Sequence, residues 1–333
     1  MIPADQPLFP VSAASDAGKG GEINEDRYRI ESFFLDEANE IASMFAIVAD
    51  GIGAQRAGQV AAELVVESVT HAVSQSDASQ PTGILQAAII QASQAVLHRA
   101  ESRREWKGMG STCLCAWLVD HRLYVASVGN SRLFLLRGRR LHQLNVVHQL
   151  PRDVAAAEPR KRGRKADDDP LRGYLGSKAP VEVDLRLVID PTGQGRGSHK
   201  KQGLQLLPND RLLLCTDGLG DSLNPNEILE FLGDRKLATA ASDLVQFALE
   251  KGAHANLTAV VIGIPPAAPP LRAQPINWKR ALASVFFLGL LVFLGLFAWW
   301  LWISQVPSLN PPTLTPIDTL TPIPTNTAIT SSQ

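Results

Sequence analysis

A long apolar run near the C-terminal end constrains this chain more than any other feature. Residues 281–303 (ALASVFFLGLLVFLGLFAWWLWI) contain no charged side chain. As an α-helix these 23 residues would span about 34 Å, enough to cross a bilayer core of about 30 Å. A buried core helix is the alternative interpretation, but such a helix rarely stays apolar on every face over this length. The run therefore predicts one C-terminal transmembrane helix.

The flanks of this run predict its orientation. Arg272, Lys279 and Arg280 precede it, whereas Asp318 is the only charged residue after it. Because basic residues stay on the cytoplasmic side, we expect a single-pass membrane protein with a cytoplasmic N-terminal domain and its tail outside. The tail, 304–333, is rich in Pro and Thr and poor in large apolar residues, so it is expected to be disordered.

The part before the apolar run has the size of one large domain. Residues 265–280 carry five prolines and predict a semi-rigid linker, which leaves 8–264 as the globular domain. The formal net charge of the chain is -1, so no overall positive field attracts nucleic acid, and we expect no nucleic-acid partner. The three cysteines lie in apolar runs without metal-ligand spacing, which favours a reducing compartment over a disulfide framework.

Strand and helix patterns mix within this domain. Apolar runs of strand length occupy 44–49, 114–119, 123–128, 133–136, 211–216 and 258–264. Apolar residues recur at helical spacing in 59–73, 83–100, 227–232 and 237–249. The three successive runs within 114–136 predict an antiparallel meander, and neighbouring strands without helices between them argue against a purely parallel sheet.

Residues 152–203 form the least regular stretch of the domain. A basic run lies against an acidic run in PRKRGRKADDDP (159–170), and such charge blocks favour a solvated insertion loop. A binding patch for an acidic partner is the alternative. GQGRG (193–197) lacks the spacing of a dinucleotide-binding loop and is interpreted as a flexible hairpin tip.

Several carboxylates lie where predicted strands end. They are Glu25 and Asp26 after a glycine-rich turn, Asp50 before Gly51, Asp217 before Gly218, and Asp221 one turn later. A single Asp-Gly pair is usually an ordinary turn, but several pairs that each end an apolar run need another explanation. Mg²⁺ and Mn²⁺ prefer carboxylate, carbonyl and water oxygens. The pattern therefore predicts a two-metal site that activates water for phosphoryl transfer.

The order of these motifs resembles a known family. The segments are NEDRYRI (24–30), FAIVADGIGAQRAGQVAAE (45–63), GSTCLCAWLVDHRLYVASVGNSRLFLLRGRRL (110–141), PLRGYLG (170–176), LLLCTDGLGDSL (212–223) and GAHANLTAVVIGI (252–264). Together they resemble the PPM, or protein phosphatase 2C, family of metal-dependent protein serine/threonine phosphatases. The resemblance implies an α+β fold: a four-layer α-β-β-α sandwich of two antiparallel sheets flanked by helices.

The resemblance also implies roles for individual residues. Asp50 would bridge two Mn²⁺ or Mg²⁺ ions, Glu25 and the Gly51 carbonyl would complete one ion, and Asp217 would hold the other. Water activated by the two ions would attack the phosphorus, and no covalent phosphoenzyme would form. The resemblance also implies that Asp26, Asn130 and Asn256 support these ligands without binding the metal themselves. Asp221 would be a ligand of a third, more weakly bound metal ion.

Three positions depart from the family pattern. Gly21 occupies the position of a phosphate-binding arginine, for which Lys19 offers only a point charge. Asn130 replaces an aspartate in the turn Gly129–Arg132. Ala255 replaces a carboxylate ligand of the metal that Asp50 and Asp217 share, which is expected to weaken that site.

The residue before Ala255 offers a substitute ligand. His254 could bind Mn²⁺ through its imidazole. The alternative, an ordinary loop histidine, is favoured because hard cations prefer oxygen.

Two functional hypotheses follow. In the first, the chain is a membrane-anchored phosphatase, with reduced activity, that acts on phosphoserine and phosphothreonine in proteins and opposes a serine/threonine kinase. In the second, it is a catalytically inactive pseudophosphatase that binds a phosphoprotein or signals through its membrane helix. The retained carboxylates favour the first hypothesis, and the three departures favour the second.

Overall fold

The computed structural model describes residues 1–21, 23–36, 41–53, 57–148, 173–189, 198–200, 202–266, 294–296, 299 and 301. The chain divides into two compact units, Met1–Ala267 and Ala268–Gln333. The predicted apolar run 281–303, the linker 265–280 and the tail lie mostly or wholly outside the described residues, as does most of the insertion 152–203.

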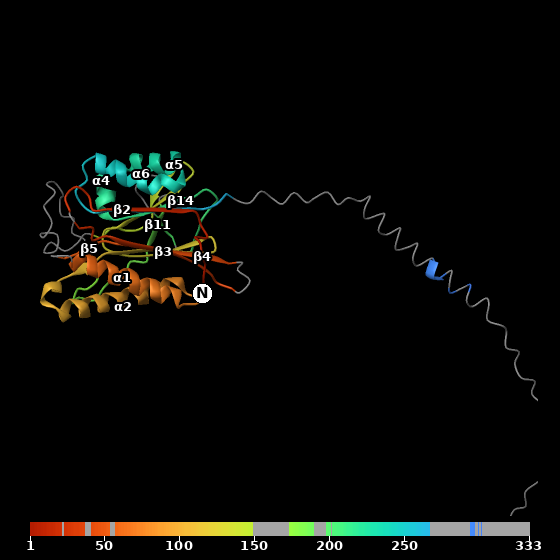
Figure 1. The fold of residues 1–333 in the computed structure, drawn as a ribbon, viewed down its shortest axis with the longest axis horizontal. Coiled ribbons are helices and arrows are strands. Elements are labelled where there is room, and N and C mark those ends of the chain that lie inside the picture. Colours follow the sequence, from red (N-terminus) through yellow and green to blue (C-terminus); the bar gives the residue numbers. More distant parts are fainter. Residues whose placement is uncertain are drawn as a thin grey trace, which may run out of the picture. The chain divides into compact units, whose positions relative to one another are not determined.

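The first unit is built on two antiparallel sheets (Figure 1). One sheet has the described strands β1 (Ile2–Pro3), β3 (Arg27–Phe34), β4 (Ala42–Ala49), β7 (Cys113–Val119), β8 (Arg122–Val128) and β13 (Leu204–Gln205), adjacent in that order. The other has β10 (Arg140–Gln143), β9 (Arg132–Arg137), β14 (Arg211–Cys215), β15 (Leu257–Gly263) and β2 (Val11–Asp16), adjacent in that order. Because β2 pairs with β15, the two ends of the domain meet in one sheet.

Helices cover the outer face of each sheet. Helices α1 (Ala57–Ser74) and α2 (Pro81–Ser102) lie on one side of the sandwich, and α5 (Pro225–Asp234) and α6 (Leu237–Glu250) lie on the other (Figure 1). The shorter described elements are α4 (Asp217–Ser222), the 3-10 turn η1 (Arg104–Trp106), and the two-stranded ladders of β5 (Gly51–Ile52) with β6 (Gly110–Ser111) and β11 (Leu187–Ile189) with β12 (Ser198–Lys200). The expected four layers, helices–sheet–sheet–helices, are confirmed.

Strands β4, β7, β14 and β15 are largely apolar because both of their faces are covered. In β4, Met44, Ala46 and Val48 contribute to the core between the two sheets, whereas Phe45 and Ile47 contribute to the core under α1 and α2. Successive side chains of a strand point to opposite faces, so a strand buried on both faces appears as a continuous apolar run.

The predicted meander within 114–136 is wrong at its third strand. β7 and β8 pair antiparallel as expected, but β9 belongs to the other sheet, where it pairs with β10 and β14. Leu133 and Leu135 of β9 join the core between the sheets. The turn Gly129–Arg132 therefore connects the two sheets. In this sheet β9 buries Leu133 and Leu135 between the two sheets, and Phe134 and Leu136 under the helices on that side.

The second unit is described at five residues only. Leu294 to Leu296, Trp299 and Leu301 are helical and exposed. Among the described residues, no helix has the length and apolar character needed to span a membrane.

The β11–β12 ladder pairs Leu187 with Lys200 and Ile189 with Ser198. It flanks 193–197, whose predicted hairpin tip lies outside the described residues. The three cysteines are buried and form no disulfide.

Candidate metal centre

Two glycines bring Glu25 against the residue that follows Asp50. A Cβ atom on Gly51 would lie 2.1 Å from the carbonyl oxygen of Gly58 and 2.8 Å from that of Glu25. A Cβ atom on Gly58 would lie 2.9 Å from the Glu25 carboxyl carbon. Side chains cannot be accommodated at these distances. The glycines therefore place the carboxylate of Glu25 beside the start of α1 and next to Asp50-Gly51.

The backbone of Asp50 is held by Thr112. The Asp50 amide donates to Thr112 Oγ1 at 2.9 Å, and the Thr112 amide donates to the Asp50 carbonyl at 2.9 Å. The Ser111 hydroxyl donates to the same carbonyl at 3.1 Å. Thr112 is fully buried. Residues 111 and 112 were not singled out from the sequence, since their role depends on a contact across the sheet.

Asn130 connects this side of the site to Asp217. Its Nδ2 donates to Asp217 Oδ2 at 2.7 Å, and the next residue, Ser131, lies with its Oγ 3.3 Å from Thr112 Oγ1. Asn130 Oδ1 is buried and has no hydrogen-bond partner among the described residues. The turn Gly129–Arg132 thus lies between Asp50 and Asp217 and contacts the residues that position both.

Asp26 is buried and contacts Thr216, the residue before Asp217. Its Oδ2 accepts from the hydroxyls of Thr216 (2.8 Å) and Thr258 (2.7 Å), while its Oδ1 is buried without a hydrogen-bond partner among the described residues. Burial raises the pKa of Asp26 most, the two threonine hydroxyls lower it, and the charge of Asp217 raises it again, to about 7. Asp26 is thus held next to the Asp217 segment through Thr216, and its predicted supporting role stays a prediction.

Asp221 has a basic partner. Arg132 Nη2 donates to Asp221 Oδ1 at 2.5 Å. A Cβ atom on Gly220 would lie 2.6 Å from Arg132 Nη1, so the glycine leaves room for the guanidinium. The ion pair joins the turn Gly129–Arg132 to α4, and the predicted part of Asp221 in a third metal site stays a prediction.

Two of the three departures from the family pattern, Gly21 and Ala255, lie in two loops that pack together. Lys19 and Gly20 donate their amides to the carbonyls of Ala253 and His254, each at 3.0 Å. A Cβ atom on Gly20 would lie 3.3 Å from His254 Nδ1, which places that ring beside the glycine loop. Gly21 lies in this loop and is exposed.

Asn256 ties these loops to Glu25. Its Oδ1 accepts from the Glu25 amide at 2.8 Å, and its Nδ2 donates to the carbonyls of Ala17 and Ile23. The Cβ atom of Ala255 would lie 3.1 Å from a Cβ on Gly218, the residue after Asp217. Position 255 is therefore next to the Asp217 motif, where a carboxylate would add an oxygen ligand.

The donors suit a hard cation. Glu25, Asp50, Asp217 and the Gly51 carbonyl supply oxygen, and the unpartnered Oδ1 atoms of Asn130 and Asp26 add oxygen around them. No three His, Cys, Asp or Glu side chains of the described ranges form a compact metal-binding group. The fit to Mg²⁺ or Mn²⁺ therefore rests on donor chemistry and on the contacts that hold these segments at one end of the sandwich.

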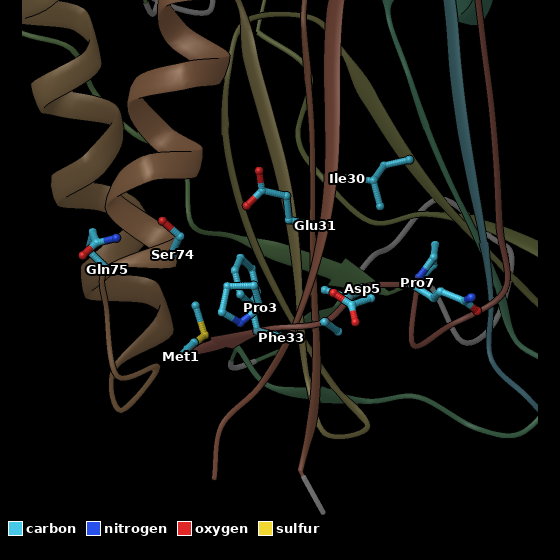
Figure 2. Close-up of a pocket in the computed structure, with 12 residues that line it drawn as sticks. Met1, Pro3, Asp5, Pro7, Ile30, Glu31, Phe33, Ser74 and Gln75 are labelled. Carbon is cyan, nitrogen blue, oxygen red and sulfur yellow. The ribbon is translucent and has the colours of Figure 1, made fainter. Parts of the chain in front are cut away.

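A separate pocket lies at the N-terminal edge of the first sheet (Figure 2). It has a volume of about 580 Å³ and is lined by the N-terminal segment, β3 and the end of α1, including Asp5, Glu31 and Ser74. None of the predicted metal ligands lines it. Figure 2 shows Ser74 and Gln75 across this pocket from Glu31 and Phe33. The pocket is therefore distinct from the candidate metal centre.

A family model described as Protein phosphatase 2C matches residues 17–261, most of the first unit. The chain belongs to the protein phosphatase 2C family. The match spans the segments of all the predicted ligands, from Glu25 to the loop at Ala255.

Two bacterial proteins are among the curated relatives of this phosphatase 2C domain. Serine/threonine phosphatase stp of Listeria monocytogenes is 28% identical over 256 residues, which cover 72% of this chain and 94% of the relative. Protein phosphatase PhpP of Streptococcus pneumoniae is 25% identical over 260 residues, covering 76% and 97%.

Solved structures share the fold. The catalytic domain of the protein phosphatase PstP, solved with two manganese ions, has a TM-score of 0.56 and 26% identity, with 77% of this chain and 97% of that chain covered. The S. agalactiae serine/threonine phosphatase has a TM-score of 0.60 and 24% identity, with 77% and 100% covered.

Proposed function

We propose that this chain hydrolyses phosphoserine and phosphothreonine in proteins as a metal-dependent phosphatase. One observation carries the proposal: within a protein phosphatase 2C fold, the segments bearing Glu25, Asp50 and Asp217 are held at one end of the sandwich by direct contacts. The alternative, a catalytically inactive binding protein, is favoured by nothing in the comparisons.

The chain's own residues would hold the metal ions. Glu25, Asp50, the Gly51 carbonyl and Asp217 would bind two divalent ions, Mn²⁺ or Mg²⁺, and the solved PstP domain with two manganese ions supports this requirement for a divalent metal. Bound ions supply charge neutralisation at phosphate and an activated water. Asn130 orients one carboxylate oxygen of Asp217 by donating to it.

The Asp217 side of the site has one anionic ligand fewer than the family pattern. Ala255 offers no oxygen from its side chain, and His254 is the nearest substitute in the sequence. We expect weaker metal binding there than in relatives with an aspartate at this position.

The cellular setting is proposed from the sequence. The run 281–303 would anchor the chain in a membrane by one helix, with the phosphatase domain cytoplasmic and the Pro/Thr-rich tail outside. Its substrates would be phosphorylated proteins, so its activity would oppose a serine/threonine kinase.

The proposal is tested with a phosphothreonine peptide, the full-length protein and added Mn²⁺. Asp50→Asn should abolish phosphate release, because the shared ligand loses its charge. Asp5→Asn is the matched control, since Asp5 is exposed and lies at the separate N-terminal pocket. Equal activity in wild type and Asp50→Asn, or no release by wild type at any Mn²⁺ concentration, would overturn the proposal.

A further inference from the structure

A buried side-chain contact between His148 and Asp184 lies behind the turn Gly129–Arg132. His148 Nε2 is 2.6 Å from Asp184 Oδ2, and the two side chains are only 3% and 2% exposed. The residues are 36 positions apart in the sequence. Neither residue belongs to the predicted metal ligands or to the contacts that hold them directly.

Arg186 is a second partner of Asp184 and supplies a positive charge beside its carboxylate. Its Nη2 lies 2.5 Å from Asp184 Oδ2, and its backbone amide donates to Asp184 Oδ1 at 2.8 Å. Burial alone would raise the pKa of Asp184, but the hydrogen bonds and charge of Arg186, aided by His148, lower it overall. A carboxylate that stays charged in this buried position can hold both partners firmly.

Both residues of the pair are also bound through their backbones to the end of β8. Asp184 and Ser127 exchange two backbone hydrogen bonds of 2.9 Å, and the His148 amide donates to the Gly129 carbonyl at 3.0 Å. The side-chain contact between His148 and Asp184 therefore closes a clamp around residues 127–129. Asn130 follows directly.

Gly129 packs closely against Thr112, the residue that holds Asp50. Gly129 has φ +105°, and a Cβ atom on it would lie 2.7 Å from Thr112 Cγ2. Thr112 binds the Asp50 backbone, and Asn130 binds Asp217. A shift of the turn would thus move the supports of two predicted ligands that come from different sheets.

We propose that the pair of His148 and Asp184 is a positioning device for the metal centre, which fixes the turn Gly129–Arg132 so that Asp50 and Asp217 meet the metal ions in the right geometry. This rests on the proposed function. Outer contacts of this kind affect metal affinity without touching the metal.

Two matched variants distinguish an effect on metal affinity from a general loss of folding stability. Asp184→Asn and Asp210→Asn make the same change in two buried aspartates, each paired with an arginine. Arg137, the partner of Asp210, lies at the opposite end of β9 from Arg132. Loss of stability is expected in both variants, but loss of metal affinity only in the first.

The measurement is Mn²⁺ binding to the full-length protein by calorimetry, alongside thermal unfolding in EDTA. Asp184→Asn is expected to raise the Mn²⁺ dissociation constant about 10-fold, and Asp210→Asn is expected to leave it within about twofold of wild type. His148→Ala should behave like Asp184→Asn. His148→Gln, which keeps an N–H donor for Asp184, should recover most of the affinity.

The outcomes are distinct. Unchanged Mn²⁺ affinity in folded Asp184→Asn and His148→Ala would overturn the proposal, as would an equal loss in Asp210→Asn. If His148→Ala does not fold, the comparison of the two aspartate variants and of His148→Gln still decides it. Mn²⁺ binding is measured without substrate. An inactive wild-type protein would therefore overturn the proposed function, but it would not by itself overturn the positioning role of His148 and Asp184.

Discussion

At the scale of single residues, position 255 lacks the carboxylate that the family pattern has there. Ala255 lies on the loop beside Gly218, next to Asp217, and is exposed. The backbone there is held by neighbouring contacts that do not depend on the side chain at 255, because Asn256 binds Glu25 and the loop at Ala17 and Ile23. The missing carboxylate can therefore be restored without rebuilding the loop.

Ala255→Asp is expected to lower the Mn²⁺ concentration for half-maximal phosphatase activity about 10- to 100-fold, because it adds an anionic oxygen ligand. Activity against a phosphothreonine peptide, measured over a Mn²⁺ titration, checks this. Ala255→Asn is the control, since it adds an amide oxygen of similar size without the charge. A titration that is the same for the three proteins would contradict the prediction.

The stability contributed by Asp184 should depend on pH. The pKa of Asp184 is lowered in the folded state, so its contribution is fully present above its ordinary pKa of about 3.9 and is lost as pH falls through the folded-state value. Asp184→Asn should thus be destabilising near neutral pH, and its difference from wild type should shrink below about pH 4. Urea unfolding from about pH 7 to about pH 3 measures both. A difference that stays constant over this range would count against a charged Asp184.

At the scale of elements, helix α5 begins with a complete capping box. Asn224 accepts from the amides of Asn226 and Glu227, and the Glu227 side chain accepts from the Asn224 amide. Lys251, just after α6, binds Glu227 at 2.7 Å. These contacts stabilise the start of α5 and join it to the end of α6, and none of the residues involved is a predicted metal ligand.

Asn224→Ala is expected to destabilise the domain by about 1 kcal/mol, because two amides at the start of the helix lose their acceptor. Thermal or urea unfolding measures the loss. Asn226→Ala changes a side chain in the same turn but keeps the capping atoms, so it should have a smaller effect. The Mn²⁺ dependence of phosphatase activity should be unchanged in both variants, and a shift in Asn224→Ala would show that α5 influences the metal centre.

At the scale of the whole molecule, the phosphatase domain and the apolar run belong to different units. The domain falls within Met1–Ala267, which includes both sheets and their helices. The run 281–303 falls within the second unit. Catalysis and membrane attachment are therefore expected to be separable.

A chain that ends at residue 267 should stay in the soluble fraction of a cell lysate, whereas the full-length chain should sediment with membranes and be released by detergent. Leu290→Asp combined with Leu291→Asp in the full-length chain should also release it, because each charge at the centre of a span costs about 3 kcal/mol. Fractionation followed by immunoblotting measures the distribution. Membrane attachment of the truncated chain, or a soluble full-length chain, would contradict the anchor.

Much of the fold could be predicted from the sequence, because buried strands and helices show as apolar runs or as apolar residues at helical spacing. The strands β4, β8 and β14 and the helices α1, α2 and α6 appear as apolar runs or helical periodicity within a few residues of their bounds. Strands β2 and β3 were missed, since their partly exposed sequences carry weaker patterns. The motif order also identified the candidate ligands, whose roles stay predictions.

The tertiary structure alone decided what depends on contacts between distant segments. The chain itself determined its apolar runs, its Asp-Gly pairs and the missing carboxylate at Ala255. That β9 leaves the first sheet, that Thr112 holds Asp50, and that His148 meets Asp184 could not be foreseen. Local patterns report whether a side chain is buried, but which partner it meets is set by how the sheets pair and pack, and this information is not local.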